Sequence, residues 1–286
     1  MGVFKKVKNY WPLIKSLQTA LLVLTGLAGY VSARCPVNNL TIIAGLIGSL
    51  FLTVSGSTIL NMVWDRDIDA KMKRTSHRPL PQGHIDAGEA WKVGLGISIL
   101  GLAWAATLDV LFAVVVFAGL FIDVVIYTIW LKRRTAWSIL WGGISGGMPI
   151  LAGRVLGMGS IDEIGILFMV GILFWIPTHI LTFSIKYADD YAAADIPTFP
   201  STHGVNQTRL IVAASSLFSA VSILVSGILL DLTMGYLRLI VVLAIGLTGM
   251  AIGTIFNASE RINLGLFKYA SLFMMTSMFM VILGAR

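Results

Sequence analysis

Charged residues and cysteines are scarce in this sequence. Only 12% of its 286 residues are charged, 57% are hydrophobic, and there is a single cysteine, Cys35. One cysteine excludes an internal disulfide and any cage of several cysteines around zinc or an iron–sulfur cluster, so we interpret Cys35 as a small apolar residue at a helix end. The mean hydropathy of +0.86 is far above that of soluble domains and predicts a protein whose solvent is the lipid bilayer.

Apolar runs long enough to cross a membrane follow one another along the chain. A hydrocarbon core about 30 Å thick needs roughly 20 apolar residues per helix. Lys5, Lys6 and Lys8 precede a first run that is too long for a signal peptide, which predicts a retained span. Residues 1–286 are therefore expected to form one all-α polytopic domain of nine transmembrane helices, near 13–32, 40–61, 90–108, 110–130, 138–157, 163–185, 209–230, 235–256 and 264–283.

The basic residues are divided unequally between the two sides of these runs. All but four of the 21 lie on the side of the N-terminus, the exceptions being Arg34, Arg154, Arg238 and Arg286. Because loops rich in Lys and Arg stay in the cytoplasm, this predicts a cytoplasmic N-terminus and an external C-terminus of a cell-membrane protein. Orientation in the membrane also explains the net charge of +7, so nucleic acid is not an expected partner.

Two long loops on the predicted cytoplasmic side, 62–89 and 186–208, are interpreted as active-site loops. Long charged loops on one face suggest chemistry there, since bare connections between helices are usually only a few residues long. Between them they hold most of the 14 acidic residues: Asp65, Asp67, Asp69, Asp86, Glu89, Asp189, Asp190 and Asp195.

The first acidic motif follows the second apolar run. If the helix continues, Asn61, Asp65 and Asp69 fall at i, i+4 and i+8 and stack on one face, about 6 Å per step. Like charges at this spacing repel, so a hard cation such as Mg²⁺, which takes few carboxylates plus phosphate oxygens, is expected between them. Asp67 lies off this face, where a lysine partner is expected. Downstream, four bases could hold a diphosphate, namely Lys71, Lys73, Arg74 and Arg78.

The second loop and a basic turn supply further candidates. Asp189 and Asp190 follow a later span and provide the second carboxylate pair that a diphosphate with two cations requires. The run Lys132-Arg133-Arg134 is either a cytoplasmic anchor or adds Lys132 or Arg134 to the phosphate site. The alternative to an active site is that both loops are solvated cytoplasmic loops, whose acidic and basic residues only pair with one another.

Several residues within the runs are less easily assigned. Polar groups in a membrane are usually functional or buried in the bundle. His179 is interpreted as either a substrate or porphyrin contact or a hydrogen-bonded histidine of the bundle, Asp123 as structural, and Arg154 as an outer-end anchor. The glycines of Gly142-Gly143 and Gly146-Gly147 favour close helix packing, or room for a flat substrate.

Taken together, these residues resemble the UbiA superfamily of intramembrane prenyltransferases, and within it the protoheme IX farnesyltransferases, or haem O synthases. Four motifs carry the resemblance. The first is Asn61-x3-Asp65-x3-Asp69 with its extension of Met72, Arg74-Thr75 and Arg78-Pro79-Leu80-Pro81; the others are Tyr127-Thr128 with Leu131 to Thr135, Gly142-Gly143 with Gly146 and Pro149, and Pro177-x-His179 with Lys186-Tyr187-x-Asp189-Asp190-Tyr191. Four ordered matches of this kind over nearly the whole chain are a specific signal.

The resemblance implies a bundle around a central cavity, with Mg²⁺ between aspartates and farnesyl diphosphate, and haem b as the acceptor. It implies enzymes of haem A synthesis or terminal oxidase assembly as further partners. Catalytic residues are then expected at Asn61, Asp65, Asp69, Asp189 and Asp190, metal ligands at Asn61, Asp65, Asp69 and Asp190, and substrate contacts at Lys71, Arg74, Arg78, Lys132, Arg134, Lys186, Tyr127, His179 and Tyr187.

The sequence departs from the branch pattern around the expected acceptor pocket. A Lys-Pro-Arg on the first helix appears as Lys15-Ser16-Leu17, and Pro-Pro-His appears as Pro177-Thr178-His179. Two alternatives therefore stay open: a related enzyme that prenylates a quinone-precursor ring or a lipid, and a non-catalytic transporter or assembly factor. A transporter should show broken helices and charges at mid-membrane depth, whereas the acids here cluster at one face.

Overall fold

A computed structural model describes residues 9–33, 39–257 and 259–285, and these residues form helices and no strand. Cys35, Lys5, Lys6 and Lys8, on which sequence-based predictions rest, lie outside this part of the chain. Eight helical segments are long and apolar enough to cross a membrane: α3 (Leu40–Trp64), α5 (Ala87–Leu108), α6 with η2 (Val110–Leu131), α7 (Ser138–Met158), α8 (Glu163–Lys186), α11 (Val205–Leu229), α12 (Met234–Phe256) and α13 (Glu260–Gly284).

The first predicted span is shorter than expected. A short 3-10 helix, η1 (Trp11–Ile14), is followed by α2 (Ser16–Ser32), which is apolar but has only 17 residues. The count of nine spans and the orientation of the termini therefore remain predictions. The predicted break between the third and fourth runs is confirmed, because Asp109 ends α5 and accepts a hydrogen bond from the backbone N–H of Phe112 at 2.7 Å, which caps α6.

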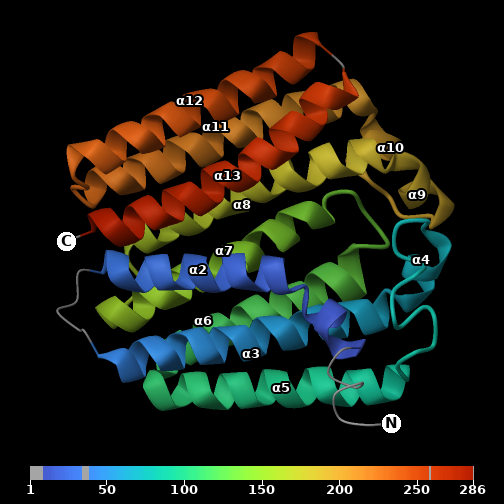
Figure 1. The fold of residues 1–286 in the computed structure, drawn as a ribbon, viewed down its shortest axis with the longest axis horizontal. Coiled ribbons are helices and arrows are strands. Elements are labelled where there is room, and N and C mark those ends of the chain that lie inside the picture. Colours follow the sequence, from blue (N-terminus) through green and yellow to red (C-terminus); the bar gives the residue numbers. More distant parts are fainter. Residues whose placement is uncertain (1–8, 34–38, 258, 286) are drawn as a thin grey trace.

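The long helices lie roughly along one direction, and the short helices gather at one end of the bundle. Figure 1 shows α4 (Arg66–Lys71), α9 (Ala188–Ala193) and α10 (Phe199–His203) together at the right, whereas α13 ends at the left. The loops at 62–89 and 186–208 are thus neighbours in space although they are far apart in the chain. This is the arrangement that a shared site requires.

Glycines allow α7 to pack directly against α8. A Cβ atom at Gly143 would lie 2.8 Å from the carbonyl oxygen of Leu173, and one at Gly147 would lie 2.7 Å from that of Met169. Real Cβ atoms do not approach so closely, so any side chain here would force the helices apart. The predicted close packing of this glycine run is confirmed.

At the end of the bundle away from the short helices, a buried ion pair joins three elements. Arg154 of α7 is 4% exposed, donates to both carboxylate oxygens of Asp162, and also donates to the Ser32 carbonyl and hydroxyl of α2. Burial alone would raise the pKa of Asp162, but hydrogen bonds from Arg154 and the Gly165 N–H hold this pKa below its ordinary value. Arg154 is therefore a buried structural clamp rather than a simple anchor at the helix end.

Candidate active site

The aspartate motif keeps its helical register where α3 passes into α4. Asp65 lies at the junction of the two helices, yet its N–H donates to the Asn61 carbonyl at 2.9 Å, and the Asp69 N–H donates to the Asp65 carbonyl at 2.8 Å. The i, i+4, i+8 spacing predicted from the sequence is confirmed at the level of the backbone. Asp65 and Asp69 are both buried, at 8% and 6% exposed, which is unusual for carboxylates. Because burying an unpaired charge is costly, each carboxylate is expected to have a positively charged partner.

Lys132 supplies the charge opposite Asp65. Its ammonium group forms an ion pair with Asp65 Oδ2, and the backbone N–H of Lys132 donates to the Tyr127 carbonyl at 2.8 Å. Burial lowers the pKa of Lys132, but the Asp65 carboxylate more than offsets this and holds the pKa above its ordinary value. Lys132 therefore keeps its positive charge beside Asp65. This position favours the interpretation that Lys132 belongs to the site over the interpretation that it is a cytoplasmic anchor.

Arg78 supplies the charge opposite Asp69. Its guanidinium donates to Asp69 Oδ2 at 2.8 Å, while the Thr75 hydroxyl donates to the Asp69 carbonyl at 2.9 Å. The chain after α4 thus folds back over the carboxylates, and the bases expected to hold a diphosphate lie beside the acids expected to hold a metal.

The second loop joins the first through Asp190. Its two carboxylate oxygens accept the backbone N–H groups of Lys73 and Arg74 at 3.3 and 3.2 Å. The two acidic regions, predicted to act together, therefore meet. We refer below to Asn61, Asp65, Asp69, Arg74, Arg78, Lys132 and Asp190 as the acid–base cluster.

A column of aromatic rings leads from this cluster into the bundle. The Arg74 guanidinium lies 4.8 Å from the Phe183 ring centroid and 5.5 Å from that of Tyr187. Phe183 contacts Phe267 at 5.7 Å between centroids, and Phe267 stacks on His179 at 4.2 Å. His179 also stacks on Trp175, with 4.9 Å between the ring centroids. His179 thus lies at the inner part of an aromatic wall between α8 and α13, away from the carboxylates.

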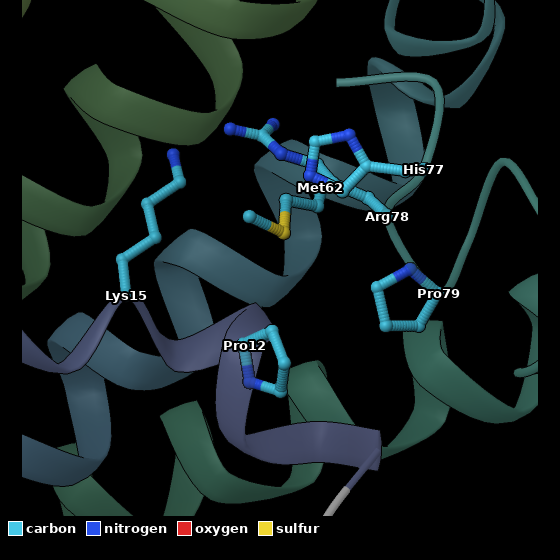
Figure 2. A pocket seen from close by; sticks show the side chains of 6 residues that line it. All are labelled: Pro12, Lys15, Met62, His77, Arg78 and Pro79. Carbon is cyan, nitrogen blue, oxygen red and sulfur yellow. The ribbon is translucent and has the colours of Figure 1, made fainter. Parts of the chain in front are cut away.

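The sequence analysis did not assign a role to Lys15, which the structure places at the cluster. A cavity of about 450 Å³ is lined by Pro12, Lys15, Met62, His77, Arg78 and Pro79, and Figure 2 shows the Lys15 side chain reaching toward the Arg78 guanidinium. No carboxylate pairs with Lys15 among the described residues. Burial, and then the charges of Arg78 and Lys132, lower the pKa of Lys15 to about 8. The Lys15 backbone is left-handed, with φ of 45°. The spacing of residues in the sequence does not predict this conformation, so the position of Lys15 at the cluster could not be found from the sequence.

Other predicted residues lie outside the cluster. On the surface, Lys71 Nζ lies 3.5 Å from Asp195 Oδ2, and Lys186 Nζ lies 3.7 Å from Glu260 Oε1. Arg134 and Asp189 are exposed.

Asp67 lies off the main face of the helix, as predicted, but the prediction that a lysine pairs with it is wrong. Arg133 binds both of its carboxylate oxygens, at 2.7 and 2.8 Å, because the basic turn lies directly opposite it.

Two atoms of the acid–base cluster are buried without a hydrogen-bond partner, and they have opposite character. They are Asp65 Oδ1, an acceptor, and Arg74 Nε, a donor. Unpaired buried polar atoms are rare in folded proteins and commonly mark a place for an ion or ligand. No group of three His, Cys, Asp or Glu side chains among the described residues forms a ready cation site. The donors present fit Mg²⁺, which accepts few protein carboxylates when phosphate oxygens complete its shell.

The fold and this site define a multi-pass membrane protein with an acid–base site at one end of a helical bundle. Residues 22–276 match the model of the UbiA prenyltransferase family, and the chain belongs to this family of prenyl-transferring enzymes. It is 40% identical to a protoheme IX farnesyltransferase of Korarchaeum cryptofilum, over 75% of this chain and 72% of that one. It is 36% identical to the Thioalkalivibrio sulfidiphilus protein of the same name, over 96% and 91%.

Solved structures share the fold at lower identity. A digeranylgeranylglyceryl phosphate synthase superposes with a TM-score of 0.80 at 18% identity, covering 98% of this chain and 99% of that one. A UbiA homologue from Archaeoglobus fulgidus bound to GPP and Mg²⁺ has a TM-score of 0.67 at 18% identity, covering 96% and 99%. The predicted polytopic helical bundle of the UbiA type is thus confirmed.

Proposed function

We propose that this protein transfers a farnesyl group from farnesyl diphosphate to a vinyl group of haem b, with Mg²⁺ as its metal. The observation that carries the proposal is the pair of unpartnered buried atoms, Asp65 Oδ1 and Arg74 Nε, within one acid–base cluster. One suits a cation and the other a phosphate oxygen. The names of the relatives at 36–40% identity support haem as the acceptor.

The chain's own residues divide the work by charge. Asp65 and Asp69, with Asp190 and the Asn61 side-chain oxygen, would hold Mg²⁺, which supplies neutralisation of the leaving diphosphate when bound. Arg74, Arg78, Lys132 and Lys15 would hold phosphate oxygens, the arginines through planar forks. Fixed charges aimed at a leaving group stabilise the charge that develops as the bond to the prenyl carbon breaks.

The aromatic column suits the other product of that bond cleavage. Ring faces attract cations, and apolar walls exclude the water that would trap an allylic cation. Phe183, Phe267, His179 and Trp175 lie in an unbroken series of ring contacts that begins at Arg74. A flat acceptor against these rings would meet the cation near the diphosphate. His179 is already stacked on two of these rings, and its Nδ1 atom lies 3.3 Å from the Ser271 hydroxyl, so it would hold this wall in place and contact the acceptor through its ring edge.

The test is a turnover assay of the purified protein in detergent, with Mg²⁺ and farnesyl diphosphate. Haem b and a quinone-precursor acid are offered in competition, a lipid glycerol phosphate is offered separately, and products are identified by mass. A farnesylated haem that disappears with EDTA and returns with Mg²⁺ is the expected result. Prenylation of another acceptor alone would retain the diphosphate site and overturn the haem assignment, whereas no product with any acceptor would revive the non-catalytic reading.

Lys15→Met is expected to raise the KM for farnesyl diphosphate about tenfold, the loss of one charge-assisted contact of about 1.4 kcal/mol. Because the pKa of Lys15 is lowered to about 8, the wild-type kcat/KM should also fall above that pH as the ammonium group loses its proton. Steady-state kinetics between pH 6.5 and 9.5 check both effects. The variant should lack the alkaline decline, and an unchanged pH profile in Lys15→Met would remove Lys15 from the phosphate site.

A further inference from the structure

Asp123 is a carboxylate inside a membrane-spanning segment, and the acid–base cluster described above does not include it. It lies half-buried in η2 (Ile122–Leu131), and no Lys or Arg forms a salt bridge with it within the described ranges. Its Oδ2 atom instead accepts two hydrogen bonds from α3, from the Ser57 hydroxyl at 2.5 Å and from Asn61 Nδ2 at 2.8 Å. Ionisable groups at such depth are costly and usually functional.

These contacts hold the Asn61 amide in one orientation. Its nitrogen donates to Asp123, and its oxygen accepts a hydrogen bond from the Thr128 hydroxyl at 2.9 Å. The reverse orientation would set the Asn61 oxygen against a carboxylate, and two acceptors cannot bond to each other. An amide oxygen has two lone pairs, so Asn61 Oδ1 keeps one for a further ligand. Asp123 therefore decides which atom of Asn61 is available.

The backbone of η2 brings the two partners of Asn61 to the same side. This segment is a π-helix, in which hydrogen bonds run from i to i+5. In an α-helix, by contrast, neighbours on one face are three or four residues apart. Asp123 and Thr128 are five apart, and both contact Asn61. The π-helical geometry thus presents a carboxylate and a hydroxyl to the two ends of one amide, and π-helical turns are frequent at functional sites.

We infer that Asp123 is a positioning residue: through Nδ2 it fixes the Asn61 amide so that Oδ1 is the atom offered to the metal of the diphosphate complex. This inference rests on the proposed function. Magnesium requires near-ideal octahedral geometry, so a ligand that rotates freely binds it poorly. Partners that orient a metal ligand from behind typically contribute 10- to 100-fold in metal affinity. Asp123 occupies that place behind Asn61.

The test measures metal binding directly, apart from turnover. Mn²⁺ is titrated into the purified protein in the presence of farnesyl thiolodiphosphate, an analogue that is not cleaved, and free Mn²⁺ is followed by electron paramagnetic resonance. Asp123→Ala is expected to weaken Mn²⁺ binding at least about tenfold, and to raise the half-activating Mg²⁺ concentration of the turnover assay by a similar factor. Asp123→Asn, which keeps an oxygen acceptor for Asn61, should restore binding to within about threefold of wild type.

A double-mutant cycle distinguishes positioning from a general structural effect. If Asp123 acts through Asn61, then Asp123→Ala adds nothing to the loss already caused by Asn61→Ala, whereas independent effects would multiply. The matched control is Asp109→Ala, which removes a capping carboxylate from the same apolar segment and should leave Mn²⁺ affinity unchanged. If Asp123→Ala does not fold, Thr128→Val releases the other end of the amide and should also weaken binding.

The outcomes separate this inference from the proposed function. Wild-type protein that binds no Mn²⁺ with the analogue would overturn the proposed metal site itself. Wild-type protein that binds Mn²⁺, with folded Asp123→Ala or Thr128→Val binding equally well, would overturn the role of Asp123 while retaining the proposed function. Multiplicative losses in the cycle would also overturn it, because Asp123 would then act independently of Asn61.

Discussion

Asp65→Ala is expected to lower turnover about a thousandfold or more, which corresponds to about 4 kcal/mol in the barrier. Asp65 carries the unpartnered buried oxygen, Oδ1, that we assign to the metal, and its other oxygen pairs with Lys132. The substitution removes a metal ligand and leaves the Lys132 charge without its carboxylate in a buried site. Turnover is measured at saturating Mg²⁺ with farnesyl diphosphate and the acceptor that the competition assay identifies.

Asp67→Ala is the matched control for this prediction. Asp67 lies two residues away, but its side chain is 61% exposed and its partner is Arg133 at the surface. An exposed ion pair contributes about 0–1 kcal/mol, so turnover should remain within about threefold of wild type. Equal losses in Asp65→Ala and Asp67→Ala would mean that the loop as a whole is sensitive, and near-normal turnover in Asp65→Ala would remove it from the metal site.

Asp162→Ala is expected to destabilise the fold by about 3 kcal/mol, the lower end of the range for breaking a buried ion pair. The substitution leaves the Arg154 guanidinium, 4% exposed, without its only acidic partner among the described residues. The lower end applies because the Asp162 side chain is itself 23% exposed. Unfolding of the detergent-solubilised protein measures the change, and the fraction that remains folded should keep its turnover, since the pair lies at the other end of the bundle.

The control for Asp162→Ala is Glu163→Ala, at an exposed neighbouring position, which should leave stability almost unchanged.

The ion pair between Arg154 and Asp162 also predicts a dependence of stability on pH. Because the pKa of Asp162 is lowered in the folded state, its contribution is present above the ordinary value of 3.8 and is lost as the pH falls through the lower, folded value. Acid destabilisation of the wild type that persists unchanged in Asp162→Ala would show that the pair does not stabilise the fold.

The features that the sequence predicted well are those determined by local periodicity. Apolar runs gave the helices because a bilayer requires each span to satisfy its own backbone hydrogen bonds, and the predicted 163–185 run appears as α8 with almost the same bounds. The spacing of Asn61, Asp65 and Asp69 survives in the structure for the same reason, since helical hydrogen bonds run from i to i+4. The glycine pairs of α7 predicted close packing, which depends only on the missing Cβ.

Partners of individual charges could not be predicted, because they depend on which loops meet in space. Lys132 rather than Arg134 reaches the aspartates, and Asp67 takes Arg133 rather than a lysine. Asp189 and Asp190 are adjacent in sequence, yet only Asp190 contacts the first loop. Such choices depend on a rotation of one residue along a helix, about 100°, which composition and spacing leave undetermined.

By itself, then, the sequence determined the membrane bundle, the family motifs and the pairing of acidic with basic groups near one end. Tertiary structure alone decided that Lys15 joins the cluster across a cavity, and that Asp123 and Thr128 meet the two ends of the Asn61 amide. The physical reason is that helical periodicity is a property of a continuous stretch of chain. Which faces meet is determined by packing among helices far apart in sequence, and in η2 by a π-helical turn that no local pattern predicted.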